Sequence, residues 1–428
     1  MKARATMVSV LIAALFTATA FPFTPLASTA TPFTQVSSRQ PKPSPTGSRL
    51  ETIFAATETN GTLFENVTAV LLKKYYDERF RTQTLPGLIS EFTEKAKHAA
   101  TLYDQRVVTE ELLSHIPASH LGLISRASHR QVMWDLEGRT YPMLGFQLIE
   151  INSKYYAFTV LEGGPAARAG VLPWDRIVAI DGISPETSSR VDWRSDDAYI
   201  GDDRDPPVHY LLASAGDTIR FKIERRRDKF IELSVPVEDY SAFAAARAST
   251  RLLKAEDRSF GYLHFWYVHM TGIPELIKDK IEGEFGKCDG LIIDLRGRGG
   301  NAFAISKIVD ALRADRAGRH RPIIALIDRQ SRSAKDVLAY ELKSQGIARL
   351  VGEPTAGAVI PASFADVGHD SILMFPTFKL PRYTDLLEAK PVAPDVLIQR
   401  AGPLSAGDDP ILNAGLAEAL KLAKSAAK

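Results

Sequence analysis

The chain has 428 residues, which at about 150 residues per domain predicts two to four domains. Its 53 Lys and Arg residues nearly balance 51 Asp and Glu residues, and with 45% hydrophobic residues this composition is typical of a globular protein. The formal net charge of +2 gives no field that would attract nucleic acid, and the single cysteine, Cys288, excludes an intramolecular disulfide framework and a multi-cysteine metal site.

Residues 1–20 are typical of a secretory signal peptide. Two basic residues precede an apolar stretch at 7–20, which ends in Ala-Thr-Ala and is shorter than the roughly 20 residues that span a bilayer. The alternative is an uncleaved membrane anchor. Residues 21–55 are rich in Pro, Ser and Thr, which predicts a linker. We therefore expect a periplasmic or extracellular protein with no stable membrane insertion after signal cleavage.

Residues 56–135 are predicted to form a helical cap. Apolar residues recur at helical spacing between 62 and 113, Pro86 and Gly87 separate two helices, and a third helix begins near Val108. Within the cap, Ser119 and His120 follow these helices, directly before an apolar run typical of a strand.

Residues 136–240 are predicted to form a small β-domain. Five runs typical of strands, separated by turn residues, lie at 146–151, 155–160, 176–180, 218–223 and 230–235. The stretch GGPAARAGVLPWDRIVAIDG resembles the PDZ signature, although Trp174 replaces its usual glycine. The preceding YPMLGF resembles the loop that holds a peptide carboxylate in PDZ domains, which implies that Leu144, Gly145 and Phe146 bind substrate. The alternative is a generic antiparallel β-domain, and 191–212 is interpreted as an insertion.

Residues 241–428 are predicted to form an α/β core. Strands are expected at 261–265, 291–295, 323–327 and 348–351, and helices at 273–285, 302–312 and 333–345. Strands that alternate with helices indicate a largely parallel sheet.

Several kinds of chemistry find little support. No H-E-x-x-H motif is present, so no metal is expected, and His264 and His269 are interpreted as structural residues. The glycine-rich stretch at 296–300 lacks the lysine and serine of a phosphate-binding loop. Its glycines instead indicate exposed backbone amides at a turn between a strand and a helix, as an oxyanion hole requires.

Three motifs in the core resemble those of the C-terminal processing, or tail-specific, serine peptidases. They are DLRGRGG at 294–300, the block from 325 to 358 that contains SRSAKD and VGEPTAGA, and Pro394-Asp395-Val396. The resemblance covers roughly residues 60–428. It implies a multidomain α+β protein with a helical cap, a PDZ-like domain and a peptidase core of the ClpP/crotonase type.

The resemblance places Ser333 at the nucleophile position, with Ser331 as a less suitable neighbour. It also implies an oxyanion hole formed by the amides of Ala334 and of Gly299 or Gly300. Ser333 is equally suited to start a helix, and the two roles are compatible, because free amides at a helix N-terminus stabilise negative charge.

The base cannot be the lysine of the Ser–Lys branch, because Ala358 occupies that position. Lys335 is an alternative, but two residues after Ser333 it faces another side of a helix. The tricorn-core branch has a Ser-His pair in the cap and a glutamate before the Pro-Asp motif. Ser119, His120 and Glu388 match that pattern.

The sequence therefore predicts an exported serine endopeptidase that cleaves polypeptides near their C-terminal tails through an acyl-enzyme. It needs no cofactor, its partners are polypeptide substrates, and a homo-oligomer is left open. Arg298, Lys335 and Pro391 depart from the family pattern and favour the alternative of an inactive peptidase-like scaffold that binds through the PDZ domain and the core cleft. A PDZ adaptor without chemistry gives no reason for the block around Ser333.

Overall fold

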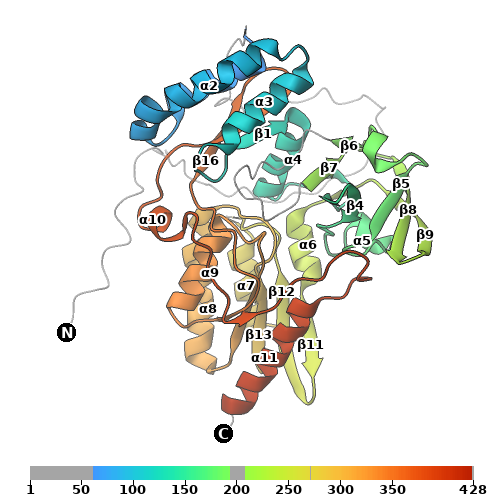
Figure 1. Cartoon of the computed structure of the whole chain (residues 1–428). Coiled ribbons are helices and arrows are strands. Elements are labelled where there is room, and N and C mark those ends of the chain that lie inside the picture. Colours follow the sequence, from blue (N-terminus) through green and yellow to red (C-terminus); the bar gives the residue numbers. More distant parts are fainter. Residues whose placement is uncertain (1–60, 193–207, 270, 427–428) are drawn as a thin grey trace, which may run out of the picture. The chain divides into compact units, whose positions relative to one another are not determined.

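The computed structural model describes residues 61–192, 208–269 and 271–426, and the fold is mixed α+β (Figure 1). The predicted signal peptide and the whole of the predicted linker lie outside the described residues, as does much of the 191–212 segment. None of the helices in the described ranges combines the length and the hydropathy that crossing a bilayer requires.

The N-terminal helices are α1 (Leu63–Lys74), the π-helical η2 (Phe80–Thr84), α2 (Leu85–His98) and α3 (Leu102–Ser114). The sequence predicted a helix break at Pro86 and Gly87, and this is wrong. The break lies at 75–77, and η2 runs directly into α2. Pro86 sits in the first turn of α2, where its missing N–H group costs no helical hydrogen bond. The third helix also begins earlier than predicted, at Leu102, where Thr101 and Asp104 form a capping box.

A three-stranded sheet joins these helices to a distant part of the chain. β1 (Gly122–Ser125) pairs antiparallel with β17 (Ser371–Pro376), which pairs in turn with β16 (Ala362–Asp366). Val367, Leu373 and Phe375 share a buried cluster with residues of α1 and α3. α4 (Arg126–Glu137) follows β1. The helical region is therefore completed by a segment about 250 residues further along the chain.

The small β-domain contains a seven-stranded sheet in the order β6-β7-β3-β4-β5-β8-β9. Its predicted strands are confirmed with small shifts: β3 (Leu148–Ile151), β4 (Lys154–Ala157), β5 (Arg176–Ile180), β8 (Thr218–Arg226) and β9 (Lys229–Pro236). Two further strands come from the 191–212 segment: β6 (Val191–Asp192) and β7 (Val208–Leu211). The domain also includes β2 (Tyr141–Met143), β10 (Glu238–Tyr240), α5 (Pro165–Arg168) and η3 (Pro185–Thr187).

The α/β core is built on a six-stranded sheet in the order β11-β12-β13-β14-β15-β18. As predicted, its strands are parallel from β12 to β18, and only the β11–β12 pair is antiparallel. The strands are β11 (Arg251–Ala255), β12 (Arg258–His264), β13 (Gly290–Asp294), β14 (Ile323–Ile327), β15 (Arg349–Gly352) and β18 (Val396–Leu397). The helices are α6 (Ala242–Ser249), α7 (Ile273–Glu282), η4 (Ala302–Ala304), α8 (Ile305–Arg319), α9 (Ala334–Ser344), α10 (Tyr383–Leu387) and α11 (Pro410–Ala426).

Alternate residues of the core strands face two buried layers. Leu291 and Ile293 pack with α7, α8 and α9, whereas Ile292 and Ile324 pack with α11 (Figure 1). Parallel strands end at one edge of a sheet. The turns that follow β12, β13 and β14 therefore meet at this edge, which places the glycine-rich loop at 296–300 beside the start of α9.

Candidate active site

Ser333 lies at the turn between β14 and α9, as the N-cap residue of the helix. Its backbone has φ 56° and ψ −117°, in a region that a residue with a side chain rarely adopts. Such backbone conformations are costly and occur where the surrounding contacts hold them, often at functional sites. The neighbouring Ser331 is fully buried, and its hydroxyl donates to the carbonyl of Leu295 at 2.8 Å. Ser333 is therefore the better placed of the two hydroxyls.

Asp336 fixes the start of α9. Its carboxylate accepts hydrogen bonds from the N–H groups of Ser333 at 2.9 Å, Gly357 at 2.9 Å and Ala358 at 3.1 Å. Burial raises the pKa of Asp336 to about 7, although these donors favour the charged form. The Ser333 N–H also reaches the carbonyl of Ala358 at 2.8 Å. Asp336 thus holds Ser333 against the 357–360 segment, a role that the sequence reasoning did not assign to it.

The glycine-rich loop approaches Ser333 as closely as a backbone can. A Cβ atom on Gly299 would lie 2.6 Å from the Ser333 Cβ atom, so only glycine fits there. Gly300 has φ 136°, and a Cβ atom on it would lie 2.4 Å from the Val268 carbonyl oxygen. Among the described residues, the N–H groups of Gly299, Gly300 and Ala334 donate no hydrogen bond. Amides left free beside a hydroxyl are what an oxyanion requires.

Ser119, His120 and Glu388 form a connected chain. The Ser119 hydroxyl donates to Glu388 Oε2 at 3.1 Å and lies 2.9 Å from His120 Nδ1, while the Ser119 N–H donates to Glu388 Oε1 at 2.8 Å. The hydroxyl has a single hydrogen, and it goes to the carboxylate. In the 2.9 Å contact between the Ser119 oxygen and His120 Nδ1, the proton must therefore be on Nδ1. This leaves Nε2 unprotonated and able to accept a proton.

Burial, together with a smaller contribution from the guanidinium of Arg332, lowers the pKa of His120 to about 3. The imidazole is therefore neutral at neutral pH, which is the form that a general base needs. Since Arg332 directly precedes Ser333 in the chain, its effect on His120 places the two regions near one another.

The 357–360 segment links the two halves of the site. The Ala358 carbonyl accepts the Ser333 N–H, and the next two N–H groups, of Val359 and Ile360, donate to Glu388 Oε2 at 2.8 and 3.2 Å. The structure thus brings Ser119, His120 and Glu388 into direct contact and ties them to the backbone that holds Ser333. A hydrogen bond between His120 and Ser333 stays a prediction.

Lys335 is fully buried and points away from this chain of residues. Its ammonium donates to the carbonyls of Phe265 at 2.5 Å, Arg296 at 2.8 Å and Trp266 at 3.1 Å. Burial lowers its pKa to about 7, whereas the carboxylates of Asp294, Asp328 and Glu162 favour the ammonium. With all three hydrogens engaged by main-chain carbonyls, Lys335 holds the glycine-rich loop to the end of β12.

Replacing Lys335 with methionine is expected to destabilise the fold by about 3 kcal/mol, because three buried carbonyls lose a charged donor. Denaturant unfolding measures this loss. The matched control is Lys343→Met on the same helix, where the side chain is 36% exposed and a change below about 1 kcal/mol is expected. Unchanged stability together with loss of reactivity at Ser333 would instead indicate that Lys335 is the base.

The side chain of Arg298, one of the departures from the family pattern, extends toward the β-domain and α4. Its buried guanidinium lies 5.8 Å from the ring of Tyr210 and interacts with Asp135 of α4. Burial lowers the pKa of Arg298 to about 10. Its charge is thus directed to the β-domain and α4.

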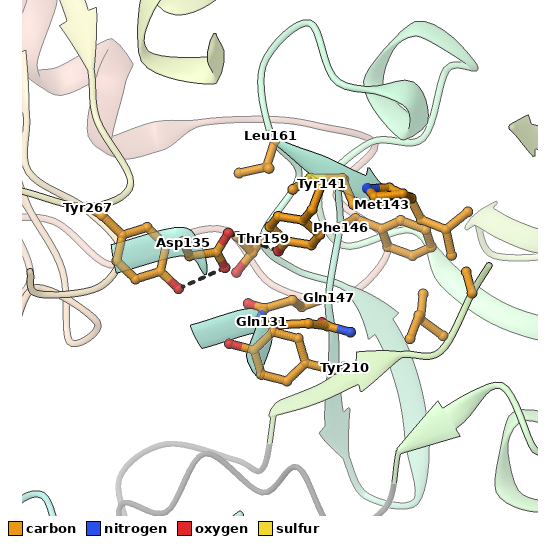
Figure 2. Close-up of a pocket in the computed structure, with 15 residues that line it drawn as sticks. Gln131, Asp135, Tyr141, Met143, Phe146, Gln147, Thr159, Leu161, Tyr210 and Tyr267 are labelled. Atoms are coloured by element: carbon orange, nitrogen blue, oxygen red, sulfur yellow. Dashed lines mark hydrogen bonds between the residues drawn. The ribbon is translucent and has the colours of Figure 1, made fainter. Parts of the chain in front are cut away.

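Figure 2 shows the surroundings of Asp135. Its carboxylate accepts from the hydroxyls of Tyr141 at 2.9 Å and Tyr267 at 3.4 Å, and burial raises its pKa to about 7. These residues line a cavity of about 50 Å³ together with the loop at 144–146. Among the described residues, the N–H groups of Leu144, Gly145 and Phe146 donate no hydrogen bond. Three consecutive free amides form a site suited to an anion.

The model of "Peptidase family S41" matches residues 303–398, a range that includes Ser333 and Glu388. The chain carries a peptidase family S41 domain.

Two curated relatives extend this similarity. The chain is 23% identical over 265 residues to the carboxyl-terminal-processing protease of Synechocystis sp., covering 56% of this chain and 58% of that protein. It is 23% identical over 285 residues to the carboxy-terminal processing protease CtpB of Bacillus subtilis, covering 60% of this chain and 55% of that protein. The chain thus aligns with somewhat less than three fifths of the length of each relative.

Among solved structures, the photosystem II D1 C-terminal processing protease has a TM-score of 0.45 and 16% identity, covering 80% of this chain and 94% of its own. The tricorn protease has a TM-score of 0.48 and 16% identity, covering 86% of this chain and 36% of its own. TM-scores below 0.5 do not establish a shared fold.

Ser119, His120 and Gly299 lie outside the range that matches the S41 model. Among the described residues, no group of three His, Cys, Asp or Glu side chains is placed to hold a metal ion. The groups that lie at this edge of the S41 domain include the hydroxyl of Ser333 and the backbone amides of Gly299, Gly300 and Ala334.

Proposed function

We propose that the protein is an exported serine endopeptidase that cleaves polypeptides near their C-terminal tails. The observation that carries the proposal is the hydrogen-bonded chain Glu388–Ser119–His120, because it places the proton of the imidazole on Nδ1 and so leaves Nε2 of His120 unprotonated, as a general base requires. The S41 domain and its processing-protease relatives support the reaction class and the substrate class. Export rests on the signal peptide expected at 1–20.

In the proposed reaction, Ser333 Oγ attacks the carbonyl carbon of the scissile bond as His120 Nε2 takes its proton. The amides of Gly299 or Gly300 and of Ala334 stabilise the oxyanion. The tetrahedral intermediate collapses when the imidazolium gives the proton to the leaving amine. Water, deprotonated by His120, then attacks the acyl-enzyme and releases the second product and Ser333. Glu388 stabilises the imidazolium through the Ser119 hydroxyl.

The small β-domain is proposed to be a PDZ-like domain that holds the carboxylate of a polypeptide tail on the amides of Leu144, Gly145 and Phe146. Holding the tail raises the effective concentration of the scissile bond near Ser333. The core is proposed to be of the ClpP/crotonase type, on the basis of the same resemblance. No cofactor enters this scheme.

Labelling of the purified protein with a fluorophosphonate probe tests the proposal. We expect a stoichiometric adduct that peptide mapping places on Ser333, absent from Ser333→Ala and present in the matched control Ser331→Ala if that variant folds. A folded wild-type protein that takes up no probe, with or without an unfolded polypeptide present, would contradict the proposal and favour the inactive scaffold.

A further inference from the structure

The outer edge of β3 is already occupied by a strand of the same chain. β7 pairs antiparallel with β3, with Leu148 opposite His209 and Ile149 opposite Val208. On its other side, β7 pairs with β6, where Val191 lies opposite Leu211. β3 directly follows the loop at 144–146. Its edge is therefore the place where an extended peptide held by that loop would add as a further strand.

Leu211 lies where the last side chain of such a peptide would lie. Continuing the register by two residues places Leu211 opposite Phe146 and Tyr210 opposite Gln147, and the Gln147 side chain is close enough to Tyr210 to lower its pKa against the effect of burial. Leu211 shares a buried cluster with Leu144 and Phe146. The four side chains of β7 are all buried. β7 thus occupies the edge of β3, and its Leu211 occupies the apolar cluster beside the free amides of residues 144–146.

We propose that β7 is an internal occupant of the β3 edge, and that a polypeptide tail ending in a leucine-sized apolar residue exchanges with it. This inference deepens the proposed function and rests on it, because it uses the tail-binding loop at 144–146 proposed there. The partner is a tail because β7 ends beside three free amides that the internal strand, having no carboxylate at that point, leaves unused.

The exchange replaces β7 with an incoming strand of similar pairing and burial. β7 has two registered residue pairs with β3 and two with β6, and an incoming strand with apolar side chains at the same positions would recover the same backbone bonds and burial. β6 is held independently, because Asp192 accepts hydrogen bonds from the hydroxyls of Ser125, at the end of β1, and Ser128 of α4. A tethered strand competes at an effective concentration of about millimolar. An isolated tail therefore binds weakly until β7 is weakened.

β7 also contacts the glycine-rich loop. Tyr210, in the middle of the strand, faces the guanidinium of Arg298, which lies between Gly297 and Gly299. A tail that exchanges with β7 takes over this contact only if it carries an aromatic residue before its last residue. The most suitable probe is therefore a peptide that ends in Val-His-Tyr-Leu with a free carboxylate.

The test measures fluorescence polarisation of this labelled peptide on Ser333→Ala protein, so that no cleavage occurs. Leu211→Ser is expected to bind the peptide at least about tenfold more tightly than the protein with Leu211. A cysteine pair, Ile149→Cys with Val208→Cys, fixes β7 to β3 when oxidised and is expected to weaken binding at least about tenfold relative to its reduced form. The matched control is Arg220→Cys with Ser234→Cys, which are paired between β8 and β9.

Equal binding by the oxidised and reduced forms of the β3–β7 pair would overturn the proposal, as would the absence of binding to every variant. An unlabelled peptide ending in Asp in place of Leu should not compete with the labelled peptide. If it did compete, the proposal that the last side chain enters an apolar cluster would be wrong. The reduced cysteine pair keeps the test valid if Leu211→Ser does not fold. Because the measurement needs no catalysis, its failure is distinct from a failure of probe labelling at Ser333.

Discussion

Replacing His120 with alanine is expected to lower kcat/KM at least about 10⁴-fold, to nearly the level of Ser333→Ala. The hydroxyl of Ser333 is a poor nucleophile unless a base accepts its proton, and the Glu388–Ser119 chain leaves His120 Nε2 unprotonated for that role. Initial rates of cleavage of a fluorogenic polypeptide, compared at equal concentrations of folded protein, measure the loss.

The matched control is His115→Ala. His115 lies five residues earlier, is exposed, and bonds to the carbonyl of Glu111 at the end of α3. Its replacement should leave the rate nearly unchanged. The double variant His120→Ala with Ser333→Ala should be no slower than Ser333→Ala, because the two side chains act in one step. A rate that does not depend on His120 would exclude it as the base.

The pH dependence gives an independent check on His120. A base must be neutral to act, so kcat/KM falls as pH falls through its pKa in the free enzyme. Burial and Arg332 both lower this pKa, so the acid limb of the plot of kcat/KM against pH should lie well below pH 6.5. Removing the cation favours the imidazolium, so Arg332→Gln should move the limb to higher pH, whereas Arg332→Lys should not.

Most of the core could be predicted from the sequence because its signals are local. Apolar runs such as 291–295 and 323–327 are long enough to be strands, and amphipathic spacing between them identifies the crossover helices. Parallel pairing follows from that alternation. The position of Ser333 follows as well, since the residue between a core strand and its helix lies at the carboxyl edge of the sheet.

The long-range pairings could not be read from composition or spacing. β1 and β17 are about 250 residues apart, and nothing local in either strand identifies its partner. β7 is short, and it is a strand because its side chains are buried against β3, which is a property of the assembled domain. The insertion expected at 191–212 gave no indication that its end would occupy the β3 edge.

At the site, the sequence motifs identified the groups but not all of their partners. Ser119, His120 and Glu388 were placed together by resemblance, and their contacts agree with it. No role was assigned to Asp336 from the sequence, although a carboxylate three residues after an N-cap is a recognisable helix start. The contacts of Arg298 depend on α4 and β7, which approach it only in the folded chain.

Replacing Glu388 with glutamine is expected to lower kcat about 10²- to 10³-fold with little change in KM. The carboxylate accepts four hydrogen bonds, three of them on Oε2 from the Ser119 hydroxyl and the N–H groups of Val359 and Ile360. The glutamine oxygen would take this place. Its NH₂ group would then face the Ser119 N–H, a donor against a donor.

In that orientation the Ser119 hydroxyl still donates to residue 388, and His120 keeps its Nδ1 proton. The loss therefore comes from two changes: the negative charge that stabilises the imidazolium is gone, and repulsion at the Ser119 N–H displaces the pair. A matched control is Glu341→Gln on α9, a buried carboxylate that accepts from Tyr383 and Gln345 and lies outside this chain of hydrogen bonds.

Glu388→Gln and Ser119→Ala together separate charge from orientation. Ser119→Ala keeps the carboxylate but removes the hydroxyl that fixes the His120 tautomer, so its rate should fall while the acid limb keeps its place below pH 6.5. Glu388→Gln removes a charge that favours the imidazolium, so the acid limb of kcat/KM in this variant should move to still lower pH. Wild-type rates in both variants would mean that the backbone alone orients His120, and would remove Glu388 and Ser119 from the mechanism.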